Sequence, residues 1–433
     1  MKLKKSLNFW DVFALALGQV IGSGIMVLIG IGIDYTAYAV PFAFILSAIL
    51  SLIKQMPVVF MGSAMPATGG LYVYCKRVLG KKIGFFYLAV LLITHILIAL
   101  FALGFANYAV ALVPALNIRY VAFGILVLFY LVNLVGIHPA AVVQKIMIVF
   151  LLVGLSSLIF FGILEVDYSN FIHQENLFPK GWYGFALACV VMSFATGGAQ
   201  YISEIGGEMK NPHRDLPRAM IFSTLIAACF FALVSIVAVG ILPLEQTANA
   251  TLSDVAREIL PDYLYVAFMV GAGLFALATS INSTFTWATK SVLIACEDGW
   301  LPKGLAVVNE RFNTPHILLT ILLFVGGAPV LLGWSLNYIV MLGSGLVFIY
   351  DMIPIIAAYL LSTRLPDVFA SAHLKLSERT LKTICVGGIL ILLAQLALSW
   401  SSIGLIGSGL IVSYIIFIIG YIHYRAKHMN IID

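Results

Sequence analysis

Two short glycine-rich stretches interrupt long apolar segments of this sequence. The first is GQVIGSGIMV at 18–27, and the second is FATGG at 194–198. Glycine destabilises a helix interior by about 1 kcal/mol relative to alanine, so helices are prone to unwind at such stretches. A helix unwound there exposes amide N–H groups where one half-helix begins and carbonyl groups where the other ends. The N–H end suits a carboxylate and the carbonyl end suits an ammonium group, so the pattern indicates a site for a zwitterion.

The segments that carry these stretches are long enough to cross a membrane. Of the 433 residues, 62% are hydrophobic and 10% are charged, a balance that excludes a soluble globular domain. A membrane-spanning helix needs about 20 apolar residues. The sequence therefore predicts an all-α membrane protein with about twelve spans, at 9–33, 38–64, 83–112, 119–136, 140–164, 183–207, 217–242, 263–294, 316–333, 336–361, 382–399 and 402–424.

Positive charge is distributed unevenly among the segments that connect these spans. Almost all of the loop lysines and arginines fall on one side, and the other side holds only Arg119, Lys180 and Arg257. Since cytoplasmic loops are enriched in lysine and arginine, residues 1–8 and 425–433 are predicted to be cytoplasmic tails of a multi-pass plasma (cytoplasmic or inner) membrane protein. The five cysteines have no paired spacing, so we expect no metal and no cofactor. No patch for nucleic acid is present.

The two glycine-rich stretches occupy matching places in this topology. The first and sixth spans start on opposite sides, so five-helix units that begin at them are inverted relative to each other. Glycine-interrupted helices at corresponding positions of inverted halves are typical of a transporter binding site at the middle of the membrane. The alternative is that these glycines only allow close packing between helices.

Four motifs resemble the amino acid–polyamine–organocation transporter superfamily. They are IGSGI at 21–25, PATGGLYVY at 66–74, FATGGAQYISEIGGEMKNPHRDLPRA at 194–219 and TKSVLIACEDGWLP at 289–302. Within the superfamily, GGAQY at 197–201 is similar to the L-amino acid transporter and exchanger branch. The resemblance implies a LeuT-type fold, with broken first and sixth helices and alternating access around a central amino acid site. Its parts would be two inverted five-helix repeats at 9–164 and 183–361, and two peripheral helices at 382–424.

The resemblance also implies roles for individual residues. Amides around Ser23, Gly24 and Ile25 would hold the substrate carboxylate, and carbonyls near the two breaks would hold its ammonium group. Phe194 would be an aromatic lid, and Tyr72 and Tyr74 would lie near the inner gate on a short cytoplasmic helix. The predicted substrate-binding residues are Val20, Ile21, Gly22, Ser23, Gly24, Ile25, Phe194, Ala195, Thr196, Gly197, Gly198, Ala199 and Gln200.

Five positions depart from the family pattern: Phe60 stands where an acidic residue is frequent, Lys290 stands where an arginine is frequent, and the other three bear on the substrate and the coupling ion. Ala199 stands where relatives often have tryptophan or phenylalanine, which favours a bulky substrate side chain if the position faces the site. Gln200 stands where many have glutamate or asparagine, and its neutral amide favours neutral over cationic amino acids. Leu151 stands where relatives with proton-linked or sodium-independent transport have a lysine, which leaves the coupling ion open.

Hydroxyl groups of the eighth span offer one ion-site hypothesis. Thr279 and Ser280, together with carbonyls of the first helix, would form an oxygen cage of the kind that sodium prefers. The alternative is that these hydroxyls bond back to their own helix. Exchange or uniport without a dedicated ion is the main expectation.

Three ionisable side chains within the spans are functional candidates. Lys54 and Asp351 lie at matching depth, so one interpretation is a buried pair; the other is that the lysine snorkels or borders a water-filled cavity. His95 either faces the substrate or relays a proton, or it bonds to a neighbouring helix.

Two glutamates follow the second glycine-rich stretch. Glu208 belongs to the EMKNP motif and is expected to anchor its loop to the basic residues around Arg214 and Arg218. Glu204 has no role in the family and is expected to hydrogen-bond within the inner vestibule.

These observations favour a secondary transporter that moves neutral, including bulky, L-amino acids by alternating access. The alternatives are a sodium- or proton-coupled symporter and a carrier of amines or modified amino acids. An enzyme is disfavoured because HExxH, GxSxG and paired-aspartate patterns are missing, and a primary pump because no P-loop is present. The expected partners are the amino acid and the lipid bilayer.

Overall fold

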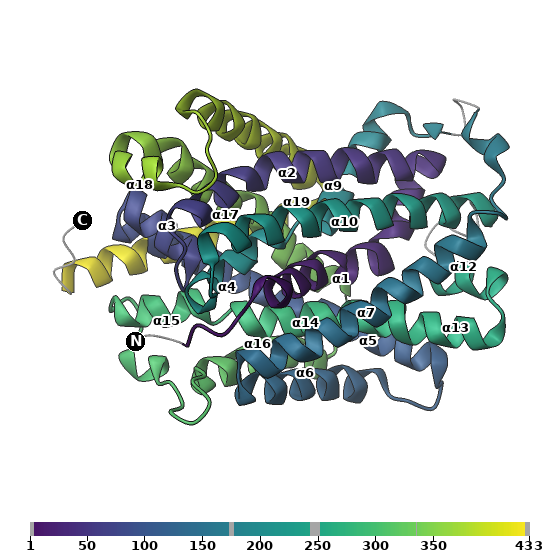
Figure 1. The fold of residues 1–433 in the computed structure, drawn as a ribbon, viewed down its shortest axis with the longest axis horizontal. Coiled ribbons are helices and arrows are strands. Elements are labelled where there is room, and N and C mark those ends of the chain that lie inside the picture. The colour runs from purple at the N-terminus through teal and green to yellow at the C-terminus, as the bar shows by residue number, and fades with distance from the viewer. Residues whose placement is uncertain (1–3, 173–176, 243–251, 335, 429–433) are drawn as a thin grey trace.

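The computed structural model describes residues 4–172, 177–242, 252–334 and 336–428 (Figure 1). Apart from three isolated β-bridges, the regular structure of these residues is helical, which confirms the all-α prediction for them. The elements are α1 (Phe9–Thr36), η1 (Ala37–Ala39), α2 (Val40–Ala64), α3 (Gly70–Leu79), α4 (Lys81–Thr94), η2 (His95–Leu97), α5 (Ile98–Leu112), α6 (Ile118–Val135), α7 (Ile137–Gly162), η3 (Tyr168–Phe171), α9 (Gly181–Thr196), η4 (Ala199–Glu204), η5 (Gly206–Glu208), α10 (Pro212–Ile241), α12 (Leu252–Ile259), α13 (Asp262–Phe268), η6 (Met269–Leu274), α14 (Phe275–Trp287), α15 (Lys290–Glu297), η7 (Lys303–Ala306), α16 (His316–Leu332), α17 (Leu336–Arg364), α18 (Pro366–Ser371) and α19 (Glu378–His428).

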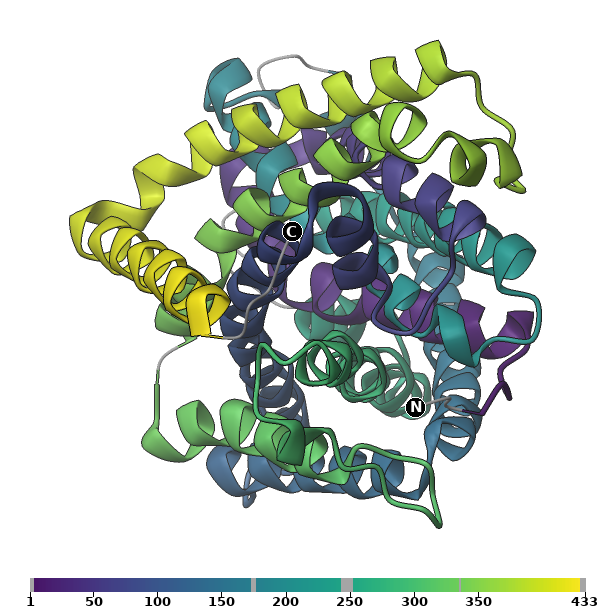
Figure 2. The ribbon, with the colours of Figure 1, turned by 90° about the vertical axis from the view of Figure 1, so that its left-hand side faces the viewer.

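Ten segments of the described chain are long and apolar enough to cross a membrane. Two shorter apolar helices, Gly181–Ser193 of α9 and His316–Leu332, occupy two further places where spans are predicted. The last two predicted spans, 382–399 and 402–424, form one helix, α19, whose two arms meet at an angle in Figure 2. Both predicted spans are among the ten segments, as Glu378–Leu398 and Gly407–His428, and the helix continues from one to the other.

Both predicted interruptions are present in the structure. α1 loses helical geometry at Gly22, where φ is −11° and ψ is −112°. α9 ends at Thr196, and the chain turns at Gly198, whose φ of +104° belongs to the left-handed region that favours glycine. The 3-10 helix η4 follows directly. The glycine pattern therefore located two true breaks.

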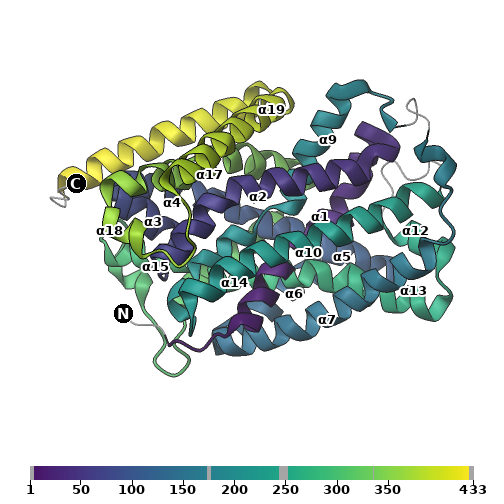
Figure 3. The same cartoon turned by 45° about the horizontal axis from the view of Figure 1, so that its top comes forward.

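The broken helix α1 lies in the middle of the bundle. It packs against α9, α10, α14 and α7, and Figure 3 shows these longer helices around it. Its start is fixed by a capping box, in which Asn8 and Asp11 each bond the other's backbone N–H. The helix that carries the first glycine-rich stretch is thus held on several sides.

The two ends of the bundle differ in composition. The short helices α3, α15 and α18 lie at one end, on the left of Figure 1, where α1 also begins and α19 ends. α12 and α13 lie at the other end. The α3 end, as we call it below, carries Lys76, Arg77, Lys303, Arg364 and Arg425 on or beside its helices.

Candidate functional site

A cavity of about 100 Å³ lies where the two interrupted helices meet. Val20 and Gly24 of α1 form one part of its wall, and Gly197 and Gly198 form another. By this measure about 10–15 Å³ accommodates one water, so the cavity has room for several ligand atoms. The two breaks that were predicted separately from the sequence therefore border one space.

Close approach of α1 and α9 explains the glycine at position 24. A Cβ atom there would lie 2.7 Å from Cβ and 2.8 Å from Cα of Ala195. These distances are shorter than real Cβ contacts, and one of the atoms belongs to the backbone and cannot rotate away. Only glycine lets the two helices meet at this part of the cavity wall.

The remaining predicted binding residues lie around this space in different ways. Gln200 of η4 lines the cavity. Buried positions that do not line it are Ile21, Gly22, Ile25, Ala195, Thr196 and Ala199. The side chains of Ser23 and Phe194 lie outside the described part of the chain. Because Ala199 does not line the cavity, the condition for a pocket enlarged by this alanine is not met.

Lys54 and Asp351 line the same cavity from α2 and α17. The Lys54 ammonium donates to Oγ of Ser193 at 2.7 Å and to Oε1 of Gln395 at 2.8 Å. Gln200 donates to Oδ1 of Asp351 at 2.9 Å. Neither charge forms a direct ion pair with a described residue, so the interpretation in which Lys54 borders a cavity is the one the structure supports.

An aromatic wall of the cavity was missed by sequence reasoning. Tyr201 stacks on Trp287, with ring centroids 4.6 Å apart, and the Trp287 indole N–H donates to Oε1 of Gln19 at 2.9 Å. His95 meets Trp287 edge-on at 5.6 Å between centroids, and Tyr201 also contacts the hydroxyl of Tyr350. A tryptophan within an apolar span needs a partner for its N–H, and that signal was available.

The predicted ion-site hydroxyls bond to protein carbonyls. Ser280 donates to the Gly18 carbonyl at 2.9 Å, and Thr279 donates to the Ala276 carbonyl of its own helix at 2.7 Å. The Gln144 amide lies beside them and donates to the Thr279 carbonyl at 3.2 Å and to Ala14 of α1 at 3.3 Å. The Ser280 hydroxyl and the Gln144 amide thus donate to two carbonyls of α1, and the Thr279 hydroxyl bonds back to its own helix.

At the α3 end, one carboxylate joins two elements. Asp298, directly after α15, accepts a hydrogen bond from Tyr72 and pairs with Lys76, both at 2.6 Å. Burial, together with the bond to Asp298, raises the pKa of Tyr72, so this phenol stays a donor. Tyr74 is fully buried, and its hydroxyl has no partner among the described residues. These contacts connect α3 with α15.

The expected partners of Glu208 are wrong. Its carboxylate pairs with Lys290 at 2.9 Å, and both side chains are buried. Arg214 instead lies 3.5 Å from its neighbour Asp215 with an exposed side chain. The reason is position: α15 brings Lys290 into the interior beside Glu208, whereas Arg214 stays at the surface. Glu204, also buried, accepts a hydrogen bond from Ser291 of the same helix.

Comparison with known families identifies the chain. The sequence profile of the family described as amino acid permease matches residues 7–422. The chain belongs to the amino acid permease family. This permease is therefore an amino acid transporter of the amino acid–polyamine–organocation superfamily and a multi-pass membrane protein.

Individual relatives agree with this assignment. The permease is 25% identical over 356 residues to the branched-chain amino acid permease BcaP of Bacillus subtilis, covering 76% of this chain and 75% of the relative. It is 25% identical over 330 residues to the serine/threonine exchanger SteT of Bacillus subtilis, covering 73% and 74%. An uncharacterized protein of Methanocaldococcus jannaschii is 28% identical over 313 residues, covering 70% and 71%.

Proposed function

We propose that this permease exchanges neutral L-amino acids across the membrane by alternating access, without a dedicated coupling ion. The observation that carries the proposal is the cavity bordered by both helix breaks, at Val20, Gly24, Gly197 and Gly198. In this proposal amides around 23–25 hold the carboxylate, and carbonyls near Val20, Ile21, Phe194 and Ala195 hold the ammonium group. A zwitterion satisfies both ends at once.

The charges around the cavity support a neutral substrate. Lys54 and Asp351 contribute one positive and one negative charge, and Gln200 contributes a neutral amide. Since the two charges of the wall sum to zero, the wall offers a substrate with a net charge no net electrostatic attraction. The relatives described as a branched-chain permease and a serine/threonine exchanger carry names of neutral amino acids. We extend the proposal to neutral amino acids as a class, since nothing at Ala199 favours bulky ones.

The absence of a coupling ion is proposed from the contacts of Ser280 and Gln144. Their hydrogens point at carbonyls of α1, and a carbonyl that accepts such a hydrogen is less available to a cation. Leu151, at the position of the family lysine, is fully buried and apolar. Exchange driven by the amino acid gradients themselves is consistent with this arrangement.

We propose the LeuT-type architecture as the framework for the motion. The inverted repeats would be 9–164 and 183–361, with 382–424 at the periphery and about twelve spans in all. The α3 end would face the cytoplasm, since its loops are rich in lysine and arginine, and both termini would lie there in the plasma or inner membrane. Tyr72 and Tyr74 would belong to the inner gate, and Phe194 would form the outer lid.

Uptake into proteoliposomes tests the proposal. Vesicles that contain the purified permease are empty or preloaded with a neutral amino acid mixture, and each labelled neutral amino acid is offered outside. Preloading is expected to accelerate uptake, with the same rate in sodium and choline and with or without a pH gradient. A requirement for sodium or protons in empty vesicles would indicate a symporter. Uptake of amines in place of any amino acid would contradict the assignment.

A further inference from the structure

We infer that Lys54, Asp351 and His95 form a subsite for the substrate side chain. This subsite selects neutral amino acids whose side chain carries a hydroxyl or a carboxamide group. The inference rests on the proposed function and narrows its substrate class. It is carried by three polar side chains that line the cavity and have hydrogen-bonding capacity that their protein contacts do not use.

The Lys54 ammonium is held in place and keeps donor capacity. Ser193 and Gln395 accept two of its three N–H donors, and Gln395 also donates to Ser193 at 2.8 Å, which closes a triangle of contacts. A lysine fixed at two points cannot snorkel toward the membrane surface. Lys54 lines the cavity, its ammonium lies 6.0 Å from the centroid of the Phe348 ring, and the two hydrogen bonds leave one N–H donor that a ligand acceptor can use.

Asp351 offers acceptor capacity beside this donor. Gln200 occupies Oδ1, whereas an ionised carboxylate has about four lone-pair sites. Asp351 and Lys54 line the same cavity without a direct ion pair, so its wall carries one charge of each sign. A ligand group that accepts from one and donates to the other lowers the cost of keeping both charges in the membrane interior.

His95 supplies the third polar atom. Its ring is 7% exposed and lines the cavity, and Nε2 has no hydrogen-bond partner among the described residues. A buried polar atom without a partner is destabilising unless a ligand satisfies it. The edge-on contact with Trp287 fixes the ring that carries this atom.

The placement of the three groups points to the side chain and not to the zwitterionic head. Lys54, His95 and Asp351 belong to α2, η2 and α17, whereas the breaks that suit the head lie in α1 and after α9. A hydroxyl or carboxamide both donates and accepts, so it can bridge the two charges. An apolar side chain leaves both charges without this contact, and a charged side chain meets one like charge. The subsite therefore favours a neutral, hydrogen-bonding side chain.

Pairs of substrates with nearly equal shape test the inference. Threonine is compared with valine, and asparagine with leucine, as labelled substrates in exchange by proteoliposomes, each scored by its kcat/KM. We expect the wild type to favour the polar member at least about 10-fold, the order of one hydrogen bond to a charged group. Lys54→Met and Asp351→Asn are expected to lower kcat/KM for threonine and asparagine more than for valine and leucine, so that both ratios move toward one.

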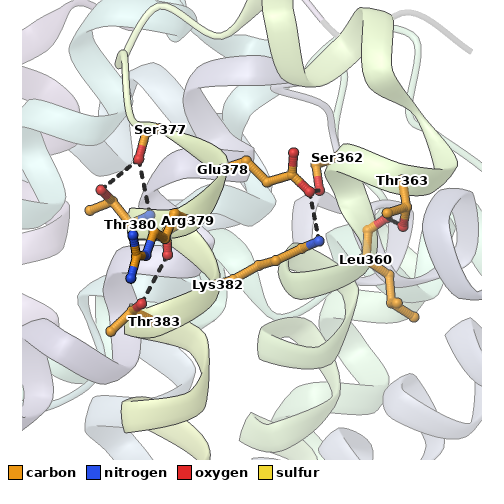
Figure 4. A network of polar contacts seen from close by, with 9 residues as sticks. All are labelled: Leu360, Ser362, Thr363, Ser377, Glu378, Arg379, Thr380, Lys382 and Thr383. Atoms are coloured by element: carbon orange, nitrogen blue, oxygen red, sulfur yellow. Dashed lines mark hydrogen bonds and ion pairs between the residues drawn. The ribbon is translucent and has the colours of Figure 1, made fainter.

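A surface lysine provides the matched control. Lys382 pairs with Glu378 at 2.6 Å on α19, away from the cavity, and Figure 4 shows this contact beside Ser362. Lys382→Met makes the same chemical change as Lys54→Met and is expected to leave both substrate ratios unchanged. The double variant Lys54→Met/Asp351→Asn removes both charges together, so neither stays unpaired if a single variant fails to fold.

The possible results separate the inference from the proposed function. A wild type that exchanges valine and leucine as well as their polar counterparts overturns the inference and leaves the proposed function standing. Folded single or double variants that lose all four substrates equally also overturn it, because the charges then serve the head group or the packing. A wild type that exchanges no amino acid refutes the proposed function itself.

Discussion

Gly24→Ala tests whether close approach of α1 and α9 is needed for transport. The new methyl group would lie 2.8 Å from Cα of Ala195, a backbone atom. To reach ordinary contact at 3.4–4 Å, the two helices must separate by about 0.6–1.2 Å. Overpacking of this kind costs about 1–3 kcal/mol, and the better helix propensity of alanine returns about 1 kcal/mol. We therefore expect a net loss of stability of up to about 2 kcal/mol.

The loss of transport is expected to exceed the loss of stability. Gly24 lies on the cavity wall, so the separation moves one half of the proposed site against the other. A displacement of about 1 Å in positioned groups costs on the order of 100-fold in enzymes, and we expect a 10- to 100-fold drop in the exchange rate. Exchange in proteoliposomes and thermal unfolding of the purified variant measure the two effects separately.

Gly420→Ala is the control for this experiment. Gly420 lies on α19, and a Cβ atom there meets nothing within 4 Å. The variant is expected to keep the wild-type exchange rate and to gain up to about 1 kcal/mol from helix propensity. Exchange by Gly24→Ala within a factor of two of the wild type, in a protein that unfolds at the same temperature, would refute the reasoning. The contact of α1 with α9 would then not shape the substrate site.

Three further predictions concern the α3 end and the coupling ion. Lys290→Met leaves Glu208 buried without its partner and is expected to lower the free energy of unfolding by about 3–5 kcal/mol. The double variant Lys290→Met/Glu208→Gln is expected to recover most of this loss. Equal unfolding temperatures of the two variants would contradict the prediction. Asp298→Asn weakens the contacts to Tyr72 and Lys76, so backbone hydrogen exchange in α3 is expected to become faster. Unchanged hydrogen exchange would show that these contacts do not stabilise the packing of α3 on α15. Replacing sodium by choline is expected to leave amino acid exchange unchanged, and a loss of more than a few fold would restore the cation-cage hypothesis.

Some features of the site follow from local sequence, and they were predicted. Breaks in α1 and after α9 depend on glycines within a few residues, at 22–24 and 197–198, so one sequence is enough to locate them. The pairing of the two breaks followed from counting spans. In the structure the two breaks border one cavity, which Val20, Gly24 and Gln200 line.

Other features depend on which faces of distant helices meet, and the sequence did not reveal them. Lys54 and Asp351 were expected at matching depth, but depth says nothing about rotation around the helix axis. Whether the two touch or share a cavity is decided by Ser193, Gln200 and Gln395, each from another element. Polar side chains from five elements, α2, α9, η4, α17 and α19, are needed to define this one group of contacts.

The partner of Glu208 also could not be predicted from the sequence. Charged residues near it in sequence were the natural candidates for its partner, yet Lys290 lies more than eighty positions away and reaches it through the packing of α15. Surface exposure made Arg214 and Arg218 unsuitable, because an exposed pair contributes little and leaves a buried carboxylate unsatisfied.

The contact between Gln395 and Lys54 has a consequence for sequence change during evolution. Gln395 lies on α19, and it accepts the hydrogen bond of a cavity lysine from α2. Loss of either side chain alone removes one contact of the other and leaves it the contact with Ser193, so the two positions are expected to vary together among relatives. Homologues that keep a lysine at position 54 should keep a hydrogen-bond acceptor at position 395. Homologues with an apolar residue at one position should have replaced the other as well. The residue at position 395 of α19 would then vary with the substrate that binds in the cavity.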